Sequence, residues 1–486
     1  MKKNICIIGS GFSSLAGACY LAQQGHKVQL FEKNKGFGGR ARQFKRDGFT
    51  FDMGPSWYWM PDVFESFFGD FNKKPSDYYA LERLDPGYEV YFGPDDRFPV
   101  HADLELLYQN FEAIEPGSAK HLKTFLQKAL ENYDIAIKDL VYRPGISPLE
   151  LVTPTTISRL NYFITNIKKE VTSKFKHPKL QQLLQFPVLF LGAKPSNTPG
   201  FYNFMNFADL GLGTWHPQTG MHAVVEAMVA LARELGVELH DDMPVKAIRV
   251  ENKKVVGLEF EDSFVAADVV LSGADYHHTE TLLPSSLRKY SERYWDKKTF
   301  APSSLLFYVG LNKKIKSVAH HTLFFDVDFD AHAASIYDQP AWPKEPLFYA
   351  NFPSISDASM APEGKEALFL LIPLAPGLED TAALRQEYFE KVMDRLEKLT
   401  GQSVKEHILF QESFCVNDFV EVYNSYKGNA YGMANTLLQT AFLRPKLKSP
   451  KVEGLYFSGQ LTVPGPGVPP ALISGKLVAE LIEKYG

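Results

Sequence analysis

The sequence predicts an α/β protein that opens with a Rossmann-like βαβ unit, and three observations near the amino terminus support this. The apolar, β-branched run Ile5-Cys6-Ile7-Ile8 is short enough for a buried parallel strand. It leads into the glycine-rich turn Gly9-Ser10-Gly11, and a second apolar run, 28–31, ends at the acidic Glu32. Strand, glycine turn, helix, strand and acidic residue in this order are typical of a unit that binds the ADP half of a dinucleotide.

The glycine-rich turn is expected to hold a pyrophosphate. Gly9 permits the tight turn, and Gly11 lets the backbone approach the phosphates, which then face the first N–H groups of the following helix. These groups belong to Phe12, Ser13 and Ser14. Ser14 replaces the third glycine of the fingerprint, which normally allows close packing of helix on strand. Glu32, followed by Lys33, lies where a carboxylate accepts both hydroxyls of an unphosphorylated ribose.

The residues after Glu32 favour FAD over NAD. Simple NAD dehydrogenases continue with another helix, whereas here Gly38-Gly39-Arg40 and then Phe51-Asp52-Met53-Gly54-Pro55-Ser56 follow. In this stretch the sequence resembles the flavin-dependent amine oxidase and carotenoid desaturase superfamily. The resemblance implies a glutathione-reductase-like FAD-binding domain in which Gly38, Gly39 and Arg40 cover the pyrophosphate. It also implies that Gly54, Pro55 and Ser56 lie along the cofactor.

The end of the chain carries a second cofactor signature. Residues 454–459 predict a strand and 471–483 a helix, whose positive end would favour an anionic reduced flavin. The intervening Pro464-Gly465-Pro466-Gly467-Val468-Pro469-Pro470 and the later Ser474-Gly475-Lys476 resemble the ending of bacterial-type phytoene desaturases, with Gln460 and Pro470 as departures. The resemblance implies that five residues of this block contact the cofactor: Gly459, Gln460, Gly467, Val468 and Ala471.

The middle of the chain extends the resemblance. Segments 190–195 and 213–221 are similar to glycine-containing elements of the same family. Strands are expected over 245–250, 255–261 and 264–271. By resemblance, Val245 pairs its backbone with the adenine.

The cofactor segments lie at both ends and in the middle, so both expected domains are discontinuous. Residues 1–80, 210–290 and 450–486 are expected to form the FAD-binding domain. An α+β domain for the substrate and for membrane association is expected from 81–209, mostly helical, and from 291–449. Strand-like runs at 304–309 and 367–372 would form the floor of the substrate cavity.

The composition narrows the class of protein. A chain of 486 residues is long enough for two domains. Its net charge of −5, from 52 basic and 57 acidic residues, argues against a nucleic-acid partner. Three cysteines without a CxxC pattern favour a reducing cytoplasm. No apolar run is long enough for a membrane span, and no signal peptide is expected.

An aromatic content of 13% suits an apolar tunnel for a long polyene, although such residues also fill ordinary cores. The aromatic residues considered for the tunnel are Tyr58, Trp59, Phe64, Phe67, Phe68, Phe111, Phe125, Tyr133, Tyr162, Phe163 and Phe175. Residues 157–179, with apolar Ile157, Leu160, Ile164 and Ile167 followed by five lysines, predict an amphipathic segment at the inner face of the cell membrane. The alternative is a core-facing helix with a solvated lysine face.

The resemblance implies phytoene desaturation toward lycopene, with hydride transfer to flavin N5 and loss of a proton from the neighbouring carbon. Glu150 and His216 are candidates for the proton acceptor, and the catalytic residues remain unassigned. Quinone or oxygen would reoxidise the flavin. A later-pathway carotenoid desaturase, such as a hydroxycarotenoid 3,4-desaturase, and an isomerase or ketolase of the same fold remain alternatives. A prenyl-lipid carrier similar to the GDP-dissociation inhibitors is the non-enzyme alternative. No metal-ligand spacing or hydrolytic triad is found.

Overall fold

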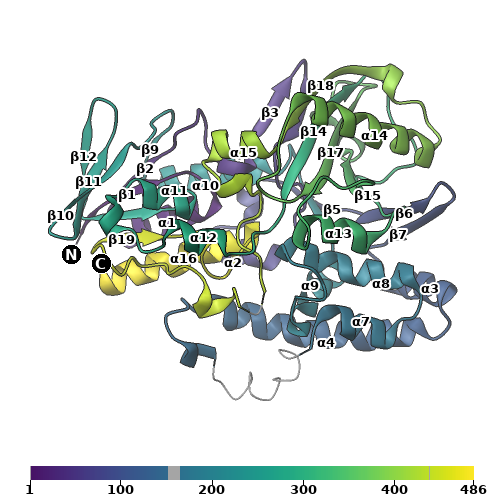
Figure 1. The fold of residues 1–486 in the computed structure, drawn as a ribbon, viewed down its shortest axis with the longest axis horizontal. Helices are drawn as coiled ribbons and strands as arrows, with labels where there is room; N and C mark the ends of the chain where they lie inside the picture. The colour runs from purple at the N-terminus through teal and green to yellow at the C-terminus, as the bar shows by residue number, and fades with distance from the viewer. Residues whose placement is uncertain (1, 152–164, 437) are drawn as a thin grey trace.

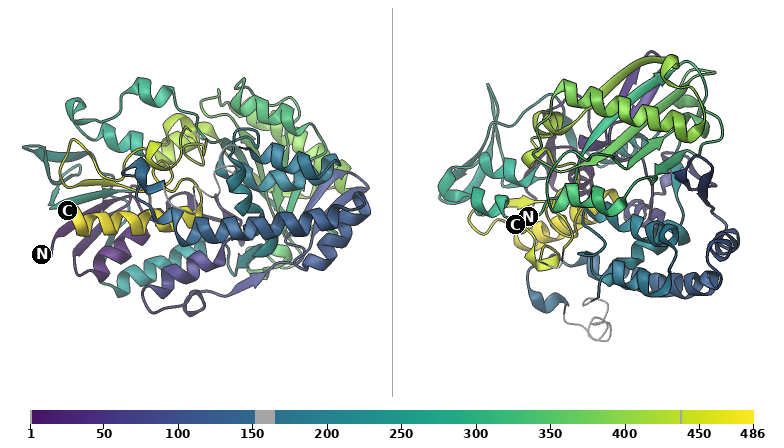
Figure 2. Two further views of the ribbon diagram at one scale, coloured as in Figure 1. Left: turned by 90° about the horizontal axis from the view of Figure 1, so that it is seen from below. Right: turned by 45° about the vertical axis from the view of Figure 1, so that its right-hand side comes forward.

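The computed structural model describes residues 2–151, 165–436 and 438–486, which form two adjoining regions (Figure 1). The first region contains a five-stranded parallel sheet of order β19-β13-β1-β2-β9. Its strands are β1 Asn4–Ile8, β2 Lys27–Phe31, β9 Glu238–His240, β13 Val269–Ser272 and β19 Leu455–Phe457. Three distant stretches of chain therefore meet in one sheet, and the predicted Rossmann-like α/β fold is confirmed. The two termini lie side by side in every view (Figure 2), and Figure 1 shows them at the outer end of this region.

Alternate residues of the sheet face two different layers, as expected for strands with a side-chain period of two. Ile5 and Ile7 pack in the same core as three helices, α1 Phe12–Gln23, α10 His222–Glu234 and α16 Val468–Tyr485. Cys6 and Ile8 pack on the other side in a core shared with a three-stranded antiparallel sheet. That sheet consists of β10 Ala247–Glu251, β11 Lys254–Glu259 and β12 Phe264–Ala266. The five-stranded sheet is thus covered on both faces.

Glycines set two close approaches in this region. A Cβ on Gly475 of α16 would lie 2.6 Å from the Ala16 Cβ and 2.6 Å from the Ser13 carbonyl oxygen, both in α1. A Cβ on Gly273, just after β13, would lie 2.1 Å from the Ser14 hydroxyl. Gly273 therefore provides the room that the serine at the third fingerprint position needs.

Two predicted element boundaries are wrong. The strand expected over 264–271 is two strands in different sheets, because the chain crosses between them at Ala267, whose N–H bonds to Val256, and Asp268, whose N–H bonds to Asn4. The last helix begins at Val468 instead of 471. Its prolines fall in the first turn, where a missing N–H breaks no helical hydrogen bond.

The second region is built on a seven-stranded sheet of order β18-β14-β17-β16-β15-β6-β7, in which only the β15–β6 pair is parallel. Its strands are β6 Tyr88–Gly93, β7 Asp96–Val100, β14 Ser303–Leu311, β15 His321–Phe324, β16 Phe348–Asn351, β17 Glu366–Leu374 and β18 Ile408–Phe414. The strands predicted at 304–309 and 367–372 are confirmed as β14 and β17. The insert expected to be mostly helical also supplies β6 and β7. How the chain divides into domains stays a prediction.

Helices surround this sheet (Figure 1). Helix α14 Ala382–Thr400 packs on one face in a core of its own. The other helices and short strands that the structure describes are α2 Pro61–Gly69, α3 Leu104–Ile114, α4 Ser118–Lys138, α7 Ile167–Lys174, α8 Pro178–Gln185, α9 Phe204–Asn206, α11 Tyr276–Thr281, α12 Glu292–Asp296, α13 Phe329–Tyr337, α15 Val416–Tyr423, β3 Gln43–Arg46, β4 Phe49–Asp52, β5 Leu81–Arg83 and β8 Trp215–Pro217.

The amphipathic segment expected over 157–179 is not one helix in its described part. Helix α7 ends at Lys174 and turns Ile167 and Val171 into the core. Three of the lysines form ion pairs with this chain: Lys168 with Asp330, Lys174 with Glu170 and Lys179 with Asp96. Ile157, Leu160 and Ile164 lie outside the described residues. From residue 165 onward the segment matches the core-facing alternative. In the described part of the chain, no helix is long and apolar enough to cross a bilayer.

Candidate functional site

A cavity of about 970 Å³ runs between the two regions and receives residues from both. At one end it meets the glycine turn after β1, and at the other it meets the seven-stranded sheet and α13. All the predicted cofactor residues except Ser14 line it: Gly9, Gly11, Phe12, Ser13, Glu32, Lys33, Gly38, Gly39, Arg40, Gly54, Pro55, Ser56, Val245, Gly459, Gln460, Gly467, Val468 and Ala471. The side chain of Ser14 is turned toward Gly273 instead.

The turn after β1 has the geometry of a phosphate cradle. Gly9 adopts φ +86°, which favours glycine, and a Cβ on Gly11 would meet no atom within 4 Å. Helix α1 begins at this point with neither a capping side chain nor an acidic residue in its first turn. Its first N–H groups are therefore free of an internal anion, which fits the FAD pyrophosphate.

Glu32 is buried and held by four donors. Its carboxylate accepts from the Ser10 N–H at 3.0 Å and hydroxyl at 2.7 Å, and from the Asn34 N–H at 2.9 Å and side-chain amide at 3.0 Å. The Ser10 hydroxyl in turn accepts from the Gly38 N–H at 3.0 Å. Ser10 thus ties the acidic residue to the Gly38-Gly39 loop. The fingerprint does not single out Ser10 or Asn34, and the sequence analysis missed both.

Arg40 brings a half-buried cation to the cavity. Its guanidinium donates to the Ser425 hydroxyl at 2.9 Å and lies 5.3 Å from the Tyr423 ring centre. Burial lowers the pKa of Arg40, and the nearby Asp275 carboxylate opposes this effect. The Arg40 Nε is buried without a partner among the described residues. A donor left over beside the phosphate cradle fits an anionic cofactor.

The 52–56 segment is fixed from two sides. A Cβ on Gly54 would lie 2.3 Å from the Arg40 carbonyl oxygen, so only glycine fits. The Asp52 carboxylate accepts the backbone N–H groups of Met221 and His222 at the start of α10. Asp52 therefore holds this segment against the helix that follows the 213–221 element.

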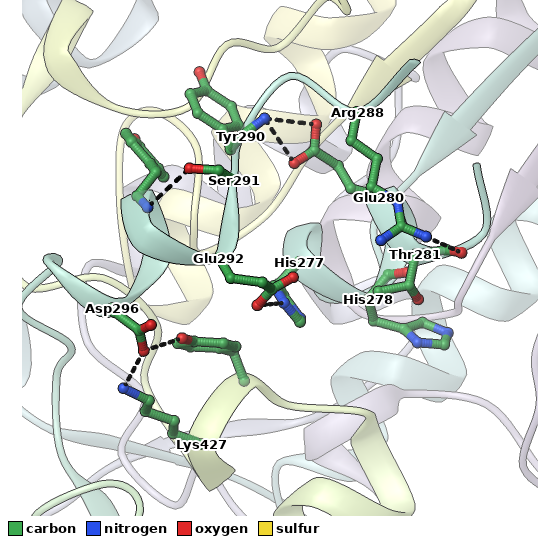
Figure 3. Close-up of polar contacts among 12 residues, drawn as sticks. His277, His278, Glu280, Thr281, Arg288, Tyr290, Ser291, Glu292, Asp296 and Lys427 are labelled. Atoms are coloured by element: carbon green, nitrogen blue, oxygen red, sulfur yellow. Dashed lines mark hydrogen bonds and ion pairs between the residues drawn. The ribbon is translucent and has the colours of Figure 1, made fainter. Parts of the chain in front are cut away.

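Near Lys33, a chain of hydrogen bonds links three side chains that line the cavity. The Lys33 ammonium donates to the Asn424 side-chain oxygen at 3.1 Å, and the Asn424 amide donates to His278 Nε2 at 3.1 Å. Burial lowers the pKa of His278 to about 4, so the ring is neutral at pH 7. Figure 3 shows how α11, which carries His278, is anchored by the pair between His277 and Glu292 and by neighbouring contacts.

The loop after β19 is held by a residue that the sequence analysis missed. The buried Arg444 guanidinium donates to the Met433 and Gln460 carbonyl oxygens and to the Asn435 side chain. Burial lowers its pKa to about 10. Arg444 thereby fixes Gln460, whose amide donates to Asn429 at 3.4 Å. No motif surrounds Arg444, so only the fold reveals this role.

The rest of the cavity is apolar and rich in aromatic residues. The aromatic residues that line it are Trp57, Trp59, Phe186, Phe201, Tyr202, Phe204, Phe325, Phe329, Tyr337, Phe348, Tyr349, Tyr431 and Phe442. Of the aromatic residues considered from the sequence, only Trp59 is among them. The others that the structure describes belong to the core, and Tyr162 and Phe163 lie outside the described residues. The expectation of an aromatic cavity is met by different residues, because composition does not tell which side of a helix faces inward.

Neither candidate proton acceptor is free for chemistry. The Glu150 carboxylate reaches the cavity but accepts three backbone N–H groups, from Gly145, Ile146 and Ser147. His216 is buried, pairs with Asp357 at 3.1 Å and is absent from the cavity lining. Glu150 therefore shapes a loop, and His216 is part of a buried polar cluster. No group of three or more acidic, histidine or cysteine residues suited to a metal occurs in the described part of the chain.

Comparison with known sequences is consistent with this site. The flavin containing amine oxidoreductase family matches residues 13–483. The chain is 42% identical to a carotenoid 3,4-desaturase of Haloarcula japonica, over 99% of this chain and 98% of that protein. It is 31% identical to a zeta-carotene-forming phytoene desaturase of Myxococcus xanthus, over 98% of this chain and 93% of that protein.

Solved structures show the same fold at low identity. An oxidoreductase from Methanosarcina mazei superposes with a TM-score of 0.65 at 16% identity, over 98% of this chain and 100% of that one. A Rab GDI from Plasmodium falciparum superposes with a TM-score of 0.58 at 11% identity, over 99% and 97%. These likenesses concern the fold alone, whereas the sequence matches extend to a family of enzymes that use FAD. The chain is therefore an FAD-dependent oxidoreductase that belongs to the flavin-containing amine oxidoreductase family, among its carotenoid desaturases.

Proposed function

We propose that this protein introduces double bonds into a long carotenoid, with FAD as the hydride acceptor. The observation that supports this most strongly is the single cavity that joins the phosphate cradle at Gly9 and Gly11 to an apolar, aromatic half. A polyene in that half is held against flat, rigid side chains and kept from water. Bound FAD supplies the two-electron acceptor, and the chain supplies binding, orientation and exclusion of water.

We propose cofactor contacts for the predicted residues that line the cavity. The N–H groups at the start of α1, with Gly38, Gly39 and Arg40, hold the pyrophosphate. Glu32 binds the ribose of the adenosine half, and Val245 lies by the adenine. Gly54 to Ser56 and the loop from Gly459 to Ala471 flank the flavin. The four donors hold the Glu32 carboxylate in one orientation, which supports its place in this proposal.

Phytoene and a later carotenoid are the two candidate substrates, and an experiment can distinguish between them. Phytoene is the substrate implied by the motifs at the end of the chain. A later carotenoid, desaturated at its 3,4 bond, is favoured by the 42% identity to the Haloarcula japonica enzyme against 31% to the Myxococcus xanthus enzyme. Purified protein with FAD would be given liposomes carrying either carotenoid, without oxygen. Loss of flavin absorbance together with red-shifted polyene bands identifies the substrate, and no change with either would refute the proposal.

We further propose that the protein works at a membrane surface, where a carotenoid is dissolved. Two segments that line the cavity, 143–150 and 440–443, adjoin each other, since Lys446 donates to the carbonyl oxygens of both Gly145 and Phe442. They and their neighbours carry exposed apolar side chains: Ile146, Leu149, Leu438 and Leu443. Leu443 both lines the cavity and is 39% exposed, which supports an opening at this place.

The membrane proposal is tested by flotation with liposomes. Leu149→Glu, at a side chain 75% exposed, should weaken flotation because it places a charge among the apolar side chains. Leu409→Glu is the matched control, since Leu409 is 49% exposed on the remote strand β18 and should change nothing. Equal flotation of both variants would refute this surface.

Quinone-containing liposomes, compared with oxygenated buffer, would show which acceptor reoxidises the flavin.

A further inference from the structure

We propose that Tyr349 is a catalytic residue that takes the proton lost by the carotenoid, and that His321 is the positioning residue that receives the hydroxyl proton of Tyr349. This inference rests on the proposed function, because it names the proton acceptor of that same reaction. Glu150 and His216, the candidates from the sequence, are both committed to other partners. Tyr349, in contrast, lines the cavity.

Tyr349 stands where the two halves of the cavity meet. It belongs to β16, is buried, and lines the cavity together with Ser56 and Trp57. Its hydroxyl lies 2.9 Å from the Ser56 hydroxyl and 2.6 Å from His321 Nδ1. Ser56 ends the segment that we assign to the cofactor. The Tyr349 hydroxyl is thus beside both the flavin segment and the aromatic half.

The hydrogen bonds define which ring nitrogen of His321 is the acceptor. The Asn351 side-chain amide donates to the His320 carbonyl oxygen at 3.0 Å, which orients its nitrogen. The same nitrogen points at His321 Nδ1 from 3.4 Å. Because an NH₂ group only donates, Nδ1 carries no proton and accepts from Tyr349. The ring proton is then on Nε2, which is buried without a partner among the described residues.

The surroundings keep His321 neutral at rest but able to hold a transient charge. Burial lowers the pKa of His321 well below its usual value, and the neighbouring His216 adds to this. The Trp57 ring stacks on the imidazole with centroids 4.1 Å apart and planes 11° apart. A ring stacked on an imidazolium stabilises it through the aromatic quadrupole. Behind His321 lies His320, 4.4 Å away between centroids, and then the pair of His216 with Asp357.

The proton step balances without a further reagent. Bound FAD would accept the hydride, and the polyene would delocalise the positive charge that remains, so the C–H bond on the neighbouring carbon would become acidic. That bond breaks, its electron pair forms the new double bond, and the proton goes to the Tyr349 oxygen. The former hydroxyl proton moves to His321 Nδ1, which leaves neutral tyrosine and an imidazolium. A weak base suffices because the donor is a carbocation, so the low pKa of His321 is compatible with this role. The proton returns along the same path to Ser56 and solvent when the product leaves.

The test compares Tyr349→Phe with His321→Asn. Tyr58→Phe is the matched control, because it removes a buried hydroxyl that bonds to Tyr79 at 2.9 Å and does not line the cavity. For each protein we would measure FAD binding by flavin fluorescence and carotenoid binding by quenching of tryptophan fluorescence. Anaerobic flavin reduction would be followed with normal carotenoid and with carotenoid deuterated at the carbon that loses the proton.

Tyr349→Phe and His321→Asn should each slow net flavin reduction on the order of 10²-fold, the usual contribution of a general base, because the cation takes its hydride back until the proton has left. FAD and carotenoid binding should stay unchanged, and the deuterium isotope effect should rise above that of the wild type. Reduction by Tyr349→Phe within about threefold of the control would overturn the assignment. So would loss of binding in step with loss of rate, which indicates a structural role. If the wild type itself reduces no flavin with any carotenoid, the proposed function fails, and the assignment fails with it.

Discussion

Replacing Gly475 with alanine tests how closely the two cofactor helices pack. The added Cβ would lie 2.6 Å from the Ala16 Cβ and 2.8 Å from the Gly17 backbone nitrogen. Carbon atoms in contact prefer about 3.5–4.0 Å, so α1 and α16 would have to separate by roughly 1 Å. Overpacking of this kind costs about 1–3 kcal/mol in a core that cannot yield. At about 2 °C per kcal/mol for a large chain, the midpoint of thermal unfolding should fall by about 2–6 °C.

The same shift should weaken FAD binding, because the first turns of both helices line the cofactor end of the cavity. A loss of about 1.4 kcal/mol raises the Kd for FAD about tenfold, which flavin fluorescence measures directly. Gly69→Ala is the control: Gly69 is the last residue of α2, and its Cβ would meet no atom within 4 Å. It should leave both quantities unchanged. A Gly475→Ala protein with the melting midpoint and FAD affinity of the wild type would refute the helix contact described above.

Three further outcomes are expected. Glu32→Gln should weaken FAD binding about 10–100-fold, since it removes the charged acceptor assigned to the ribose hydroxyls, which is worth about 1–3 kcal/mol; unchanged affinity by fluorescence titration would contradict the ribose assignment. Burial raises the pKa of Asp209 from 3.8 to about 8, so between these values the folded state binds a proton that the unfolded state lacks, and stability falls as pH rises. Asparagine mimics the protonated acid, which accepts a hydrogen bond from Tyr88, so Asp209→Asn should remove the part of the pH dependence that is due to Asp209. The slope of the free energy of unfolding against pH, measured by denaturation at several pH values, should decrease by up to about 1.4 kcal/mol per pH unit. Equal slopes for the variant and the wild type would show that Asp209 is ionised throughout. The three cysteine thiols are buried, so a maleimide should label none until the protein is unfolded, and rapid labelling of the native protein would contradict the packing of these thiols.

The residues that meet at the glycine-rich end of the cavity were predictable because they are close in sequence and strictly ordered. Gly9, Gly11 and Glu32 follow from a strand, a turn and a second strand, and the structure places them around one end of the cavity. The identity of the partners of Glu32 was not predictable. Ser10 and Asn34 carry no pattern of their own, and they matter only because the fold aims their donors at a buried carboxylate.

For the substrate half of the cavity, the sequence predicted the apolar, aromatic character of the lining but not the residues that form it. The aromatic content indicated an apolar cavity, but those residues considered from the sequence that the structure describes fill the core, apart from Trp59, which lines the cavity. Helical periodicity shows that a face is apolar and does not show whether that face meets a neighbouring helix or a ligand. The lysines after residue 167 illustrate the same limit, since acidic residues far along the chain pair with two of them, Lys168 and Lys179.

The Rossmann-like unit, the preference for FAD and the resemblance to the carotenoid desaturases could be predicted from the order of residues, because they depend on motifs whose chemistry requires particular residues at particular spacings. Three contacts emerged only from the folded chain: Gly273 accommodates Ser14, Arg444 holds the loop after β19, and Tyr349 lies between Ser56 and His321. Each of these contacts joins residues on separate elements. Their meeting depends on how sheets and helices pack, and a linear pattern does not contain that information.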